Sequence, residues 1–417
     1  MLKAVPSIQQ AVHFSGLEAP VLLRNAEALF PVLKHALPSW TFSVADGATS
    51  PAPSMTITGQ GDGTFVCQSI DPAVRARRWD DVNAVCEMIV ALAWAQIQAN
   101  PTMLCLHCAA VAFNGRLVLF PNRRRSGKST LTAVLAQRGY TVFSDDFLPI
   151  RIGDDGLMFG VANGINPRLR LPISDGFSTN FKTWVQGVTE ISNGQYAYLG
   201  IDTLAPRGAL LPIGAIVALD RQDSPCETGF HVIEPVEILD DLITQNFGRM
   251  AHSGRILAAS HGVAQTALRH RLTYNSAEDA ATFLENQFQH WDAPVAQLID
   301  KSLPVGTTAD IQVMEAEPAR LDPDAEYKRA AGIHEISIAD QVYVSDGHGV
   351  GIQKLNPGSS LIWGILEDQV TLAEIIDLLC AAFPEHPRSA IATDCANTLQ
   401  QFLENHLIES AISLGEH

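Results

Sequence analysis

The chain has 417 residues, 47% of them hydrophobic, and a formal net charge of −17. This length exceeds that of one ordinary core, so we expect two or three domains. The negative charge argues against nucleic acid as a partner, because phosphate backbones need a basic face. No segment reaches the roughly 20 apolar residues of a membrane-spanning helix, and the N-terminus has no signal-peptide pattern. We therefore expect a cytoplasmic protein that contacts no membrane.

Residues 1–100 are expected to form an N-terminal α+β region that packs on the catalytic core. Up to residue 78, short apolar runs alternate with Gly, Ser and Pro, which favours short strands joined by loops. From Asp80 to Ala99 the apolar residues recur at helical spacing. Asn100-Pro101 then ends this helix.

The next segment has the order of a nucleotide site. Two strands, "LHCAAVAF" and "RLVLFP", are joined by Asn114-Gly115, a strong hairpin signal. A loop and a helix follow, and Gly139 favours a left-handed cap at the end of that helix. The strand "YTVFS" then leads to Asp145 and Asp146. A strand, a loop, a helix, a strand and acids in this order are typical of an α/β nucleotide site.

Cys105 and Cys108 form a C-x-x-C pair at the start of this segment. A zinc site usually needs a second such pair, and a thioredoxin-like motif should open a helix rather than enter an apolar strand. We interpret both cysteines as buried strand residues. The scattered positions of all seven cysteines are typical of reduced thiols in a cytosol.

Residues 126–130, "SGKST", form the second half of a phosphate-binding loop. In such a loop the backbone N–H groups and a helix N-terminus point at one anion. Lys128 adds positive charge at the β- and γ-phosphates, and the hydroxyl of Ser129 holds Mg²⁺. We therefore predict that Ser126, Gly127, Lys128, Ser129 and Thr130 bind ATP with Mg²⁺.

The first half of this loop departs from the usual pattern. Asn122 occupies the position of the first glycine, and asparagine is one of the few residues that tolerate positive φ. Arg123, Arg124 and Arg125 follow it. Their side chains either point to solvent or contact the γ-phosphate or an acidic substrate, as arginine forks do. We include all four residues in the predicted nucleotide site.

Asp145 and Asp146 supply the remaining chemistry. Phosphoryl transfer needs Mg²⁺ held on the phosphates and a base near the attacking hydroxyl. Two adjacent carboxylates can divide these tasks, although one of them can instead cap a helix. His107, on the strand that leads towards the loop, is either a core histidine or a member of the site. We predict that Asp145, Asp146 and Lys128 are catalytic.

The remaining chain divides into three parts. Residues 101–292 form the predicted catalytic domain, which ends in the buried strand "GAIVALD" and a closing helix, "EDAATFLENQFQHW". Residues 293–329 are rich in Pro, Asp, Ala and Glu and are expected to be a linker. Residues 330–417 form a small unit of strands followed by helices at 359–367, 371–382 and 391–406, with a capping box at Thr371 and Glu374.

The stretch "LHCAAVAFNGRLVLFPNRRRSGKSTLTAVLAQRGYTVFSDDF" resembles the core of the HPr kinase/phosphorylase family. That family has a histidine on the strand before the loop, a loop ending in G-K-S, and an "RG…DD" segment. The matching residues here are His107, Gly127-Lys128-Ser129, Arg138-Gly139 and Asp145-Asp146. The resemblance implies an α/β (α+β) kinase core with a fold like that of phosphoenolpyruvate carboxykinase.

The same resemblance implies residue roles. Asp146 would accept the proton of a substrate serine, Ser129 would bind Mg²⁺ together with Asp145, and His107 would support catalysis. Glu190 is the candidate for a further metal ligand, and Arg207 for a further site residue. The family's signature for the reverse, phosphate-removing reaction is not recognisable, so the resemblance does not extend to that reaction or to HPr as the substrate.

The stretch "VYVSDGHGVGIQKLNPGSSLIWGILEDQVTLAEIIDLL", followed by "DCANTLQQFLENHLIE", resembles PqqD-type domains, which recognise leader peptides of ribosomally made, modified peptides. The resemblance implies a small winged-helix domain with a β-hairpin or sheet and three helices. It also implies that residues 330–417 capture a peptide or small protein as an added strand at a sheet edge. The alternative is a domain that only docks the dimer or the kinase.

We therefore expect an ATP-dependent kinase that phosphorylates a Ser/Thr hydroxyl on a captured peptide or small protein, in ribosomal-peptide modification. A homo-oligomer and a peptide-modifying enzyme as a second partner are part of this expectation. Two alternatives remain open. One is a non-catalytic, ATP-binding peptide chaperone, and the other is a small-molecule kinase with a regulatory C-terminal domain.

Overall fold

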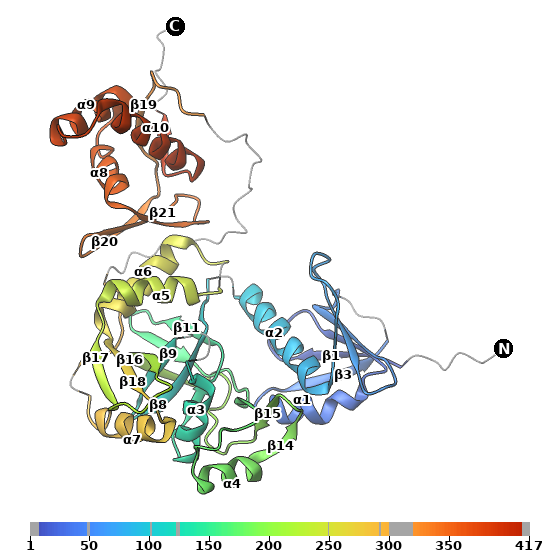
Figure 1. Ribbon diagram of the computed structural model, residues 1–417. Coiled ribbons are helices and arrows are strands. Elements are labelled where there is room, and N and C mark those ends of the chain that lie inside the picture. The colour runs from blue at the N-terminus through green and yellow to red at the C-terminus, as the bar shows by residue number, and fades with distance from the viewer. Residues whose placement is uncertain are drawn as a thin grey trace. The chain divides into compact units, whose positions relative to one another are not determined.

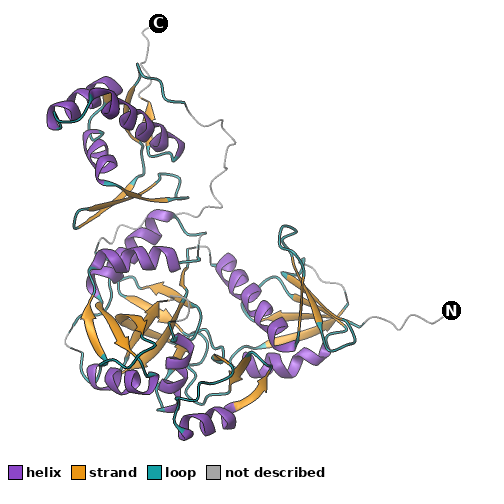
Figure 2. Cartoon of the chain, in the orientation of Figure 1, coloured by secondary structure: helices purple, strands orange, loops and turns teal. Residues whose placement is uncertain are grey.

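The computed structural model describes residues 8–47, 51–100, 102–121, 126–248, 250–291, 293–299 and 320–410. The chain forms two compact units. The first comprises Met1–Glu234, Thr244–Gly248 and Thr266–Gln297, and the second comprises Pro235–Ile243, Arg249–Gln265 and Leu298–His417. Both units mix helices with strands (Figure 1, Figure 2), which confirms the predicted mixed α/β class.

The N-terminal part of the first unit is a six-stranded sheet with the order β3-β1-β2-β4-β5-β6. Its strands are β1 (Gln9–Phe14), β2 (Val21–Arg24), β3 (Phe42–Asp46), β4 (Met55–Gly59), β5 (Phe65–Ser69) and β6 (Arg77–Trp79). The associated helices are η1 (Glu27–Leu29), α1 (Phe30–Ala36) and α2 (Asp81–Ala99). The predicted helix is confirmed as α2, and the Asp80 carboxylate caps it by accepting from the Asn83 N–H at 2.8 Å.

Helix α2 has almost the bounds predicted for it, but it is more apolar than the sequence analysis allowed. Among the described residues it is the one helix long and apolar enough to cross a membrane, with a mean hydropathy of 1.3 over its best window. Half of that window is buried in the structure, because α2 packs against α1 and strands β4–β6. A core helix of this kind meets the same criterion, so the length of α2 does not indicate a membrane span.

A nine-stranded sheet forms the centre of the first unit. The main order is β10-β8-β9-β16-β12-β11-β7, and β18 pairs with both β16 and β17. The strands are β7 (Leu104–Leu106), β8 (Cys108–Phe113), β9 (Arg116–Pro121), β10 (Val142–Ser144), β11 (Leu148–Ile152), β12 (Met158–Val161), β16 (Leu210–Arg221), β17 (Gly229–Val232) and β18 (Leu268–Tyr274). The predicted β8–β9 hairpin is confirmed, with φ values of 45° at Asn114 and 81° at Gly115.

Strands β9, β16 and β18 run parallel to one another in the middle of this sheet. Their carboxyl ends therefore lie at the same edge of the sheet. Helices α3 (Lys128–Gln137) and α7 (Ala277–Gln287) pack side by side (Figure 1). A three-stranded sheet, β13 (Arg168–Arg170), β14 (Thr189–Ser192) and β15 (Tyr196–Leu199), and helix α4 (Thr179–Val188) complete this part.

The second unit has its own core around the buried Trp363. Its helices are α5 (Pro235–Gln245, of which the last two residues belong to the first unit), α6 (Ser253–Thr266, of which the last residue belongs to the first unit), α8 (Pro357–Ile365), α9 (Leu372–Ala382) and α10 (Arg388–Glu404). Its strands are β19 (Glu326–Arg329), β20 (His334–Ile338), β21 (Gln341–Ser345), β22 (Ile352–Leu355), β23 (Val370–Thr371) and β24 (Ile408–Ser410). The predicted capping box at Thr371 and Glu374 is confirmed.

The second unit includes elements that lie outside residues 330–417, the range expected for it from the sequence. Strand β19 lies at the end of the segment expected to be a linker, and it pairs with β23 and β24. Helix α5 contributes Asp240, whose carboxylate accepts from the Tyr343 hydroxyl at 2.6 Å and pairs with Lys354 Nζ at 2.5 Å. The second unit therefore includes residues from before the expected linker.

Candidate active site

The second half of the phosphate-binding loop leads directly into α3. Gly127 is the N-cap residue of α3 and has φ 86° and ψ 11°, a left-handed conformation that favours glycine. The N–H groups of the first turn of a helix have no partner within the helix and favour an anion. The predicted nucleotide contacts Asn122, Arg123, Arg124 and Arg125 lie outside the described residues, and their roles stay predictions.

A tyrosine that the sequence analysis did not identify holds this loop. The Tyr274 hydroxyl, at the end of β18, donates to the Ser126 carbonyl oxygen at 2.6 Å. A Cβ atom on Gly127 would lie 2.5 Å from the same hydroxyl oxygen. Gly127 is therefore required both by its φ value and by the close approach of Tyr274.

The loop also buries polar groups. Ser126 is 8% exposed and Lys128 is 9% exposed. The Ser126 Oγ atom has no hydrogen-bond partner within the described part of the chain. Buried polar atoms are normally hydrogen-bonded, so an orphaned one in a phosphate-binding loop suits a bound anion or its water.

Asp145 follows β10 and is buried. Its Oδ2 atom accepts from the Arg168 backbone N–H at 3.1 Å. Its Oδ1 atom is buried, and no hydrogen bond of standard geometry reaches it from any residue that the structure describes. Burial raises the pKa of Asp145, while the positive charge of Lys128 opposes that rise. A carboxylate with an unsatisfied, buried oxygen is a suitable ligand for a divalent cation.

Asp146 lies beside Asp145 but faces solvent, and 64% of its side chain is exposed. Its Oδ1 atom lies 2.7 Å from His107 Nε2. Partial desolvation raises the pKa of Asp146, but the hydrogen bond and charge of His107 outweigh this effect, so the pKa lies below its usual value. Asp146 is therefore ionised at neutral pH and positioned by the histidine.

The polypeptide around the two aspartates is fixed by buried hydrogen bonds. The Ser144 hydroxyl bonds to the Phe147 carbonyl oxygen at 2.7 Å and to the Cys108 carbonyl oxygen at 3.0 Å. The Asn163 side-chain amide donates to the Phe147 carbonyl oxygen at 2.9 Å. These bonds set the direction in which Asp145 and Asp146 leave the strand, and no local sequence pattern identifies them.

A cavity of about 250 Å³ brings the predicted residues together. Ser129, Asp145 and Asp146 line it, and so does Arg168, which the sequence analysis missed. The Arg168 guanidinium stacks over the Tyr196 ring at 4.3 Å and contacts Cys86 Sγ. The cavity therefore contains a cation, two carboxylates and the hydroxyl predicted to bind Mg²⁺.

The structure does not bring Glu190 to this cavity. Its carboxylate lies 3.1 Å from His35 Nδ1, is 76% exposed, and lines a separate cavity. Arg207 is also elsewhere, because its guanidinium lies 3.6 Å from the Trp40 ring centroid. The geometry gives neither residue a role beside Ser129, and the described residues contain no group of three or more His, Cys, Asp or Glu side chains arranged for a metal.

The C-x-x-C pair lies in the strands next to His107. Both Cys105 and Cys108 are buried, and burial raises the pKa of Cys108 to about 12. Burial likewise raises the pKa of Cys105. Because the thiolate is the reactive and metal-binding form, neither thiol is prepared for that chemistry at neutral pH.

In the second unit, a groove of about 650 Å³ lies between α8, α9 and α10. Leu361, Phe383 and Ile391 supply apolar side chains, and Leu361 is 48% exposed. Strand β22 is at the edge of the sheet β20-β21-β22. An open sheet edge and an apolar groove are the two features that peptide-binding domains use for extended segments.

The comparisons with known proteins identify part of the chain. Residues 344–408 match the family model "Coenzyme PQQ synthesis protein D (PqqD)", so the C-terminus carries a PqqD domain, as the sequence pattern predicted. No curated protein matches the chain. PqqD domains bind peptide substrates, which supports a peptide partner.

One similar solved structure is the Hpr(Ser) kinase/phosphatase from Coxiella burnetii. It is 12% identical, and the match covers 44% of this chain and 95% of that chain with a TM-score of 0.22. At this TM-score the likeness is too slight to carry a conclusion about the present chain.

Proposed function

We propose that this chain is an ATP-dependent kinase that phosphorylates a Ser or Thr hydroxyl on a peptide or small protein captured by its PqqD domain. The observation that carries the proposal is the single cavity lined by Ser129, Asp145 and Asp146 at the N-terminus of α3. Phosphate binding, metal binding and proton acceptance are thereby available at one place.

The phosphates of ATP lie on the loop in this proposal. The backbone N–H groups at Gly127 and Lys128 face the β- and γ-phosphates, and the buried ammonium of Lys128 neutralises their charge. The Ser129 hydroxyl and Asp145 hold Mg²⁺, and the orphaned Asp145 Oδ1 atom fits this role. When bound, Mg²⁺ neutralises charge on the phosphate oxygens.

Asp146 acts on the acceptor. The substrate hydroxyl oxygen forms a bond to the γ-phosphorus while the bond from that phosphorus to the departing ADP oxygen breaks. The hydroxyl proton passes to the Asp146 carboxylate, which His107 holds at 2.7 Å. A carboxylate with a lowered pKa is a weak base, but phosphoryl transfer depends mainly on positioning and charge stabilisation, so a well-placed weak base suffices. Arg168 adds positive charge to the same cavity.

The PqqD domain supplies the acceptor. An extended peptide adds to the open edge of β22, and its apolar side chains enter the groove that includes Leu361. Tethering raises the effective concentration of the acceptor hydroxyl at the active site, so weak recognition of the residue itself suffices. From the sequence motifs we also propose an HPr kinase-like core fold, a winged-helix fold for the PqqD domain, a cytoplasmic homo-oligomer and a peptide-modifying enzyme as a second partner.

The test uses the full-length chain with Mg²⁺, γ-labelled ATP and an array of peptides that contain Ser and Thr. We expect label on peptide hydroxyls with the natural chain. Asp146→Asn should reduce transfer by roughly 10²- to 10⁴-fold, as loss of a general base does, and should leave ATP affinity unchanged. Retained transfer in this variant would exclude the role of Asp146.

The same experiment separates the two alternatives. A peptide chaperone binds both ATP and peptide but transfers no label to any peptide in the array. A small-molecule kinase labels a small acceptor, and substitutions in the groove between α8, α9 and α10 of the PqqD domain do not change its activity.

A further inference from the structure

A second cavity lies beside the start of helix α3. It has a volume of about 420 Å³, and Gly127 and Thr130 form the wall that belongs to the loop and α3. Ser129 and the two aspartates line the catalytic cavity instead, and of the residues lining either cavity only Arg170 lines both. The two cavities are therefore lined by largely different residues: one cavity has the catalytic groups, and the other has no assigned role.

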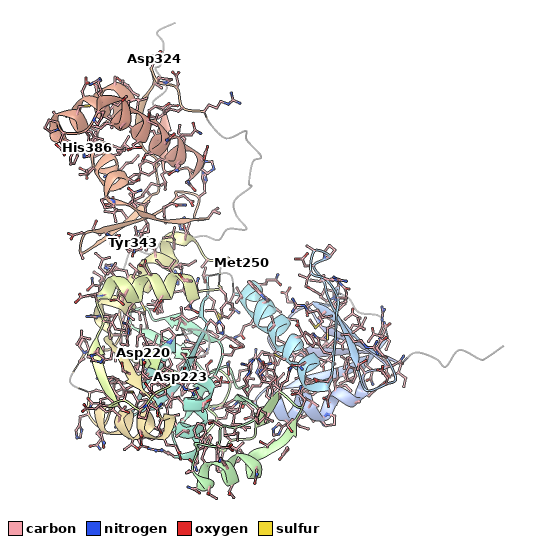
Figure 3. The ribbon with its side chains drawn as sticks, viewed as in Figure 1. Asp220, Asp223, Met250, Asp324, Tyr343 and His386 are labelled. Atoms are coloured by element: carbon pink, nitrogen blue, oxygen red, sulfur yellow. The ribbon has the colours of Figure 1, made fainter. Side chains whose placement is uncertain are left out.

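The position of this second cavity follows from the sheet. Because β9, β16 and β18 are parallel, the segments after them meet at one edge. The loop follows β9, Asp223 follows β16, and Asn275 follows β18. Figure 3 shows Asp223 beside Asp220, the latter on β16. Open parallel sheets bind ligands outside the carboxyl ends of their strands, and this cavity is at such an edge.

The walls combine an aromatic surface with polar groups. Phe177 and Phe181 supply aromatic side chains, with ring centroids 4.9 Å apart, and Phe177 is half-buried, so part of its side chain is accessible. Asp223, Asn275 and the exposed Arg221 supply polar groups. A flat heteroaromatic base stacks on an aromatic ring, and carboxylate and amide groups suit ribose hydroxyls.

The wall formed by the segment before α4 is fixed in place. The Ser178 hydroxyl and backbone N–H bond to the Glu278 carboxylate of α7 at 2.6 and 3.0 Å. The Leu171 N–H also donates to the Gln195 carbonyl oxygen at 2.7 Å. Phe177 is thus presented by a segment anchored at both ends, so the cavity is a preformed feature.

We infer that this cavity binds the nucleoside part of the phosphate donor, with the base against Phe177 and the ribose near Asp223 and Asn275. The inference rests on the proposed function, because it takes the donor phosphates to lie on the loop. A cavity of this volume falls within the roughly 300–1,000 Å³ of small-molecule sites. The donor is then a nucleoside triphosphate, whereas an inorganic polyphosphate leaves this cavity unused.

The test compares two probes that carry a phosphate chain, with and without a nucleoside. Titration calorimetry with Mg²⁺ and the full-length chain measures the Kd of the non-hydrolysable ATP analogue adenylyl imidodiphosphate and of inorganic tripolyphosphate. Phe177→Leu keeps apolar bulk but removes the aromatic ring. It should weaken binding of the analogue about tenfold, as loss of one stacking contact does, and leave tripolyphosphate within about twofold of the natural chain.

Two further variants complete the test. Phe177→Tyr keeps the ring and should retain the affinity of the natural chain. Phe283→Ala removes another half-buried aromatic side chain, on α7 outside the cavity, and should change the Kd of neither probe. Equal effects of Phe177→Leu on both probes, or none on either, would overturn the inference.

The inference and the proposed function fail in different ways. If the natural chain binds neither probe, the loop is not a phosphate site and the proposed function falls with the inference. If Lys128→Ala abolishes binding of both probes but Phe177→Leu affects neither, only the nucleoside site is wrong. Equal affinity of the natural chain for the two probes also overturns the nucleoside site alone.

Discussion

The candidate active site buries polar groups of its loop and one of its two carboxylates, whereas the groove of the PqqD domain exposes apolar side chains. Asp145 and Lys128 are both less than a tenth exposed, and Asp145 Oδ1 and Ser126 Oγ are buried without partners in the described residues. The groove instead presents Leu361 with nearly half of its surface exposed. The buried polar groups of the active site suit one ion of fixed geometry. The apolar groove can accept different peptide side chains.

This difference predicts how the two regions respond to substitution. At the active site, one changed atom removes an interaction that nothing else replaces, so effects on transfer are large. In the groove, several apolar side chains share the contact, so effects are graded and confined to peptide affinity. The predictions below test this contrast, from the largest expected effect to the smallest.

The largest effect is expected for Asp145→Asn. The amide cannot replace a carboxylate as a metal ligand, so Mg²⁺-dependent nucleotide affinity and transfer should fall at least about 100-fold. Folding raises the pKa of this carboxyl, so its charge opposes folding once the pH exceeds its ordinary value near 4. At pH 7 the neutral asparagine should therefore raise the Tm of the unliganded chain.

Asp220→Asn is the matched control for this variant. Asp220 is a half-buried carboxylate on β16 that accepts from the Thr273 hydroxyl at 3.2 Å and lines neither cavity beside the loop. Its replacement should leave transfer unchanged. A fall in Tm for Asp145→Asn, or equal loss of transfer in both variants, would contradict the interpretation of Asp145 as a buried metal ligand.

The second prediction concerns the glycine at the N-terminus of α3. Gly127→Ala places a methyl group at positive φ and 2.5 Å from the Tyr274 hydroxyl oxygen. The loop must shift, so ATP affinity should fall at least tenfold, about 1.4 kcal/mol. Gly139→Ala has a similar φ of 90° but meets nothing within 4 Å, so it should cost only about 1–2 kcal/mol of backbone strain in the free energy of unfolding.

Calorimetric Kd values and chemical denaturation of both glycine variants separate strain from steric conflict. The double variant Gly127→Ala/Tyr274→Phe removes the hydroxyl oxygen and should recover part of the ATP affinity. If Gly139→Ala weakens ATP binding as much as Gly127→Ala does, the close approach of Tyr274 has no role.

The third prediction concerns the PqqD groove. Leu361→Glu places a charge in the groove and should raise the KM for a captured peptide about tenfold, since a buried leucine contributes about 1.5–3 kcal/mol. Leu378→Glu is the matched control, because Leu378 is 53% exposed but does not line the groove. Steady-state transfer kinetics should show no change in kcat or in ATP affinity for either variant, and equal KM changes would exclude the groove as the capture site.

The contrast between the regions also explains what the sequence could reveal. The G-K-S-T loop, the Asn114-Gly115 hairpin and the capping box at Thr371 are local patterns in which neighbouring residues determine the backbone. The hairpin and the capping box formed as predicted, and helix α3 begins at Lys128 within the G-K-S-T stretch. The PqqD resemblance likewise rests on a continuous stretch of sequence.

Residues that reach the active site through strand pairing gave no such signal. Tyr274 contacts Ser126 across 148 residues of sequence, because β18 pairs with β16 and β16 pairs with β9. Arg168 reaches Asp145 from another small sheet. Glu190 was chosen by resemblance, but its strand β14 directs it towards His35. These positions depend on register between distant strands, which no local pattern specifies.

The smallest effect is expected in the pH profile of kcat, at its acid limb, which is the range where transfer activity is lost as the pH falls. His107, Lys128 and Arg168 all lower the pKa of Asp146 against the effect of desolvation, and His107 is the largest of these three influences. A lowered carboxyl pKa favours the folded, ionised state above the ordinary value near 4 and loses that effect as the pH falls through the folded pKa. Removal of His107 should therefore move the loss of transfer activity to a higher pH.

His107→Ala and His107→Gln, compared with the natural chain in kcat profiles from about pH 3 to pH 8, distinguish positioning from simple structural support. Glutamine can still donate a hydrogen bond to Asp146, so its acid limb should lie between those of the natural chain and the alanine variant. A structural role alone predicts lower activity at every pH with an unmoved limb. An unmoved limb in both variants would show that His107 does not act through Asp146, and would leave the aspartate to be positioned by its backbone contact to Ser144.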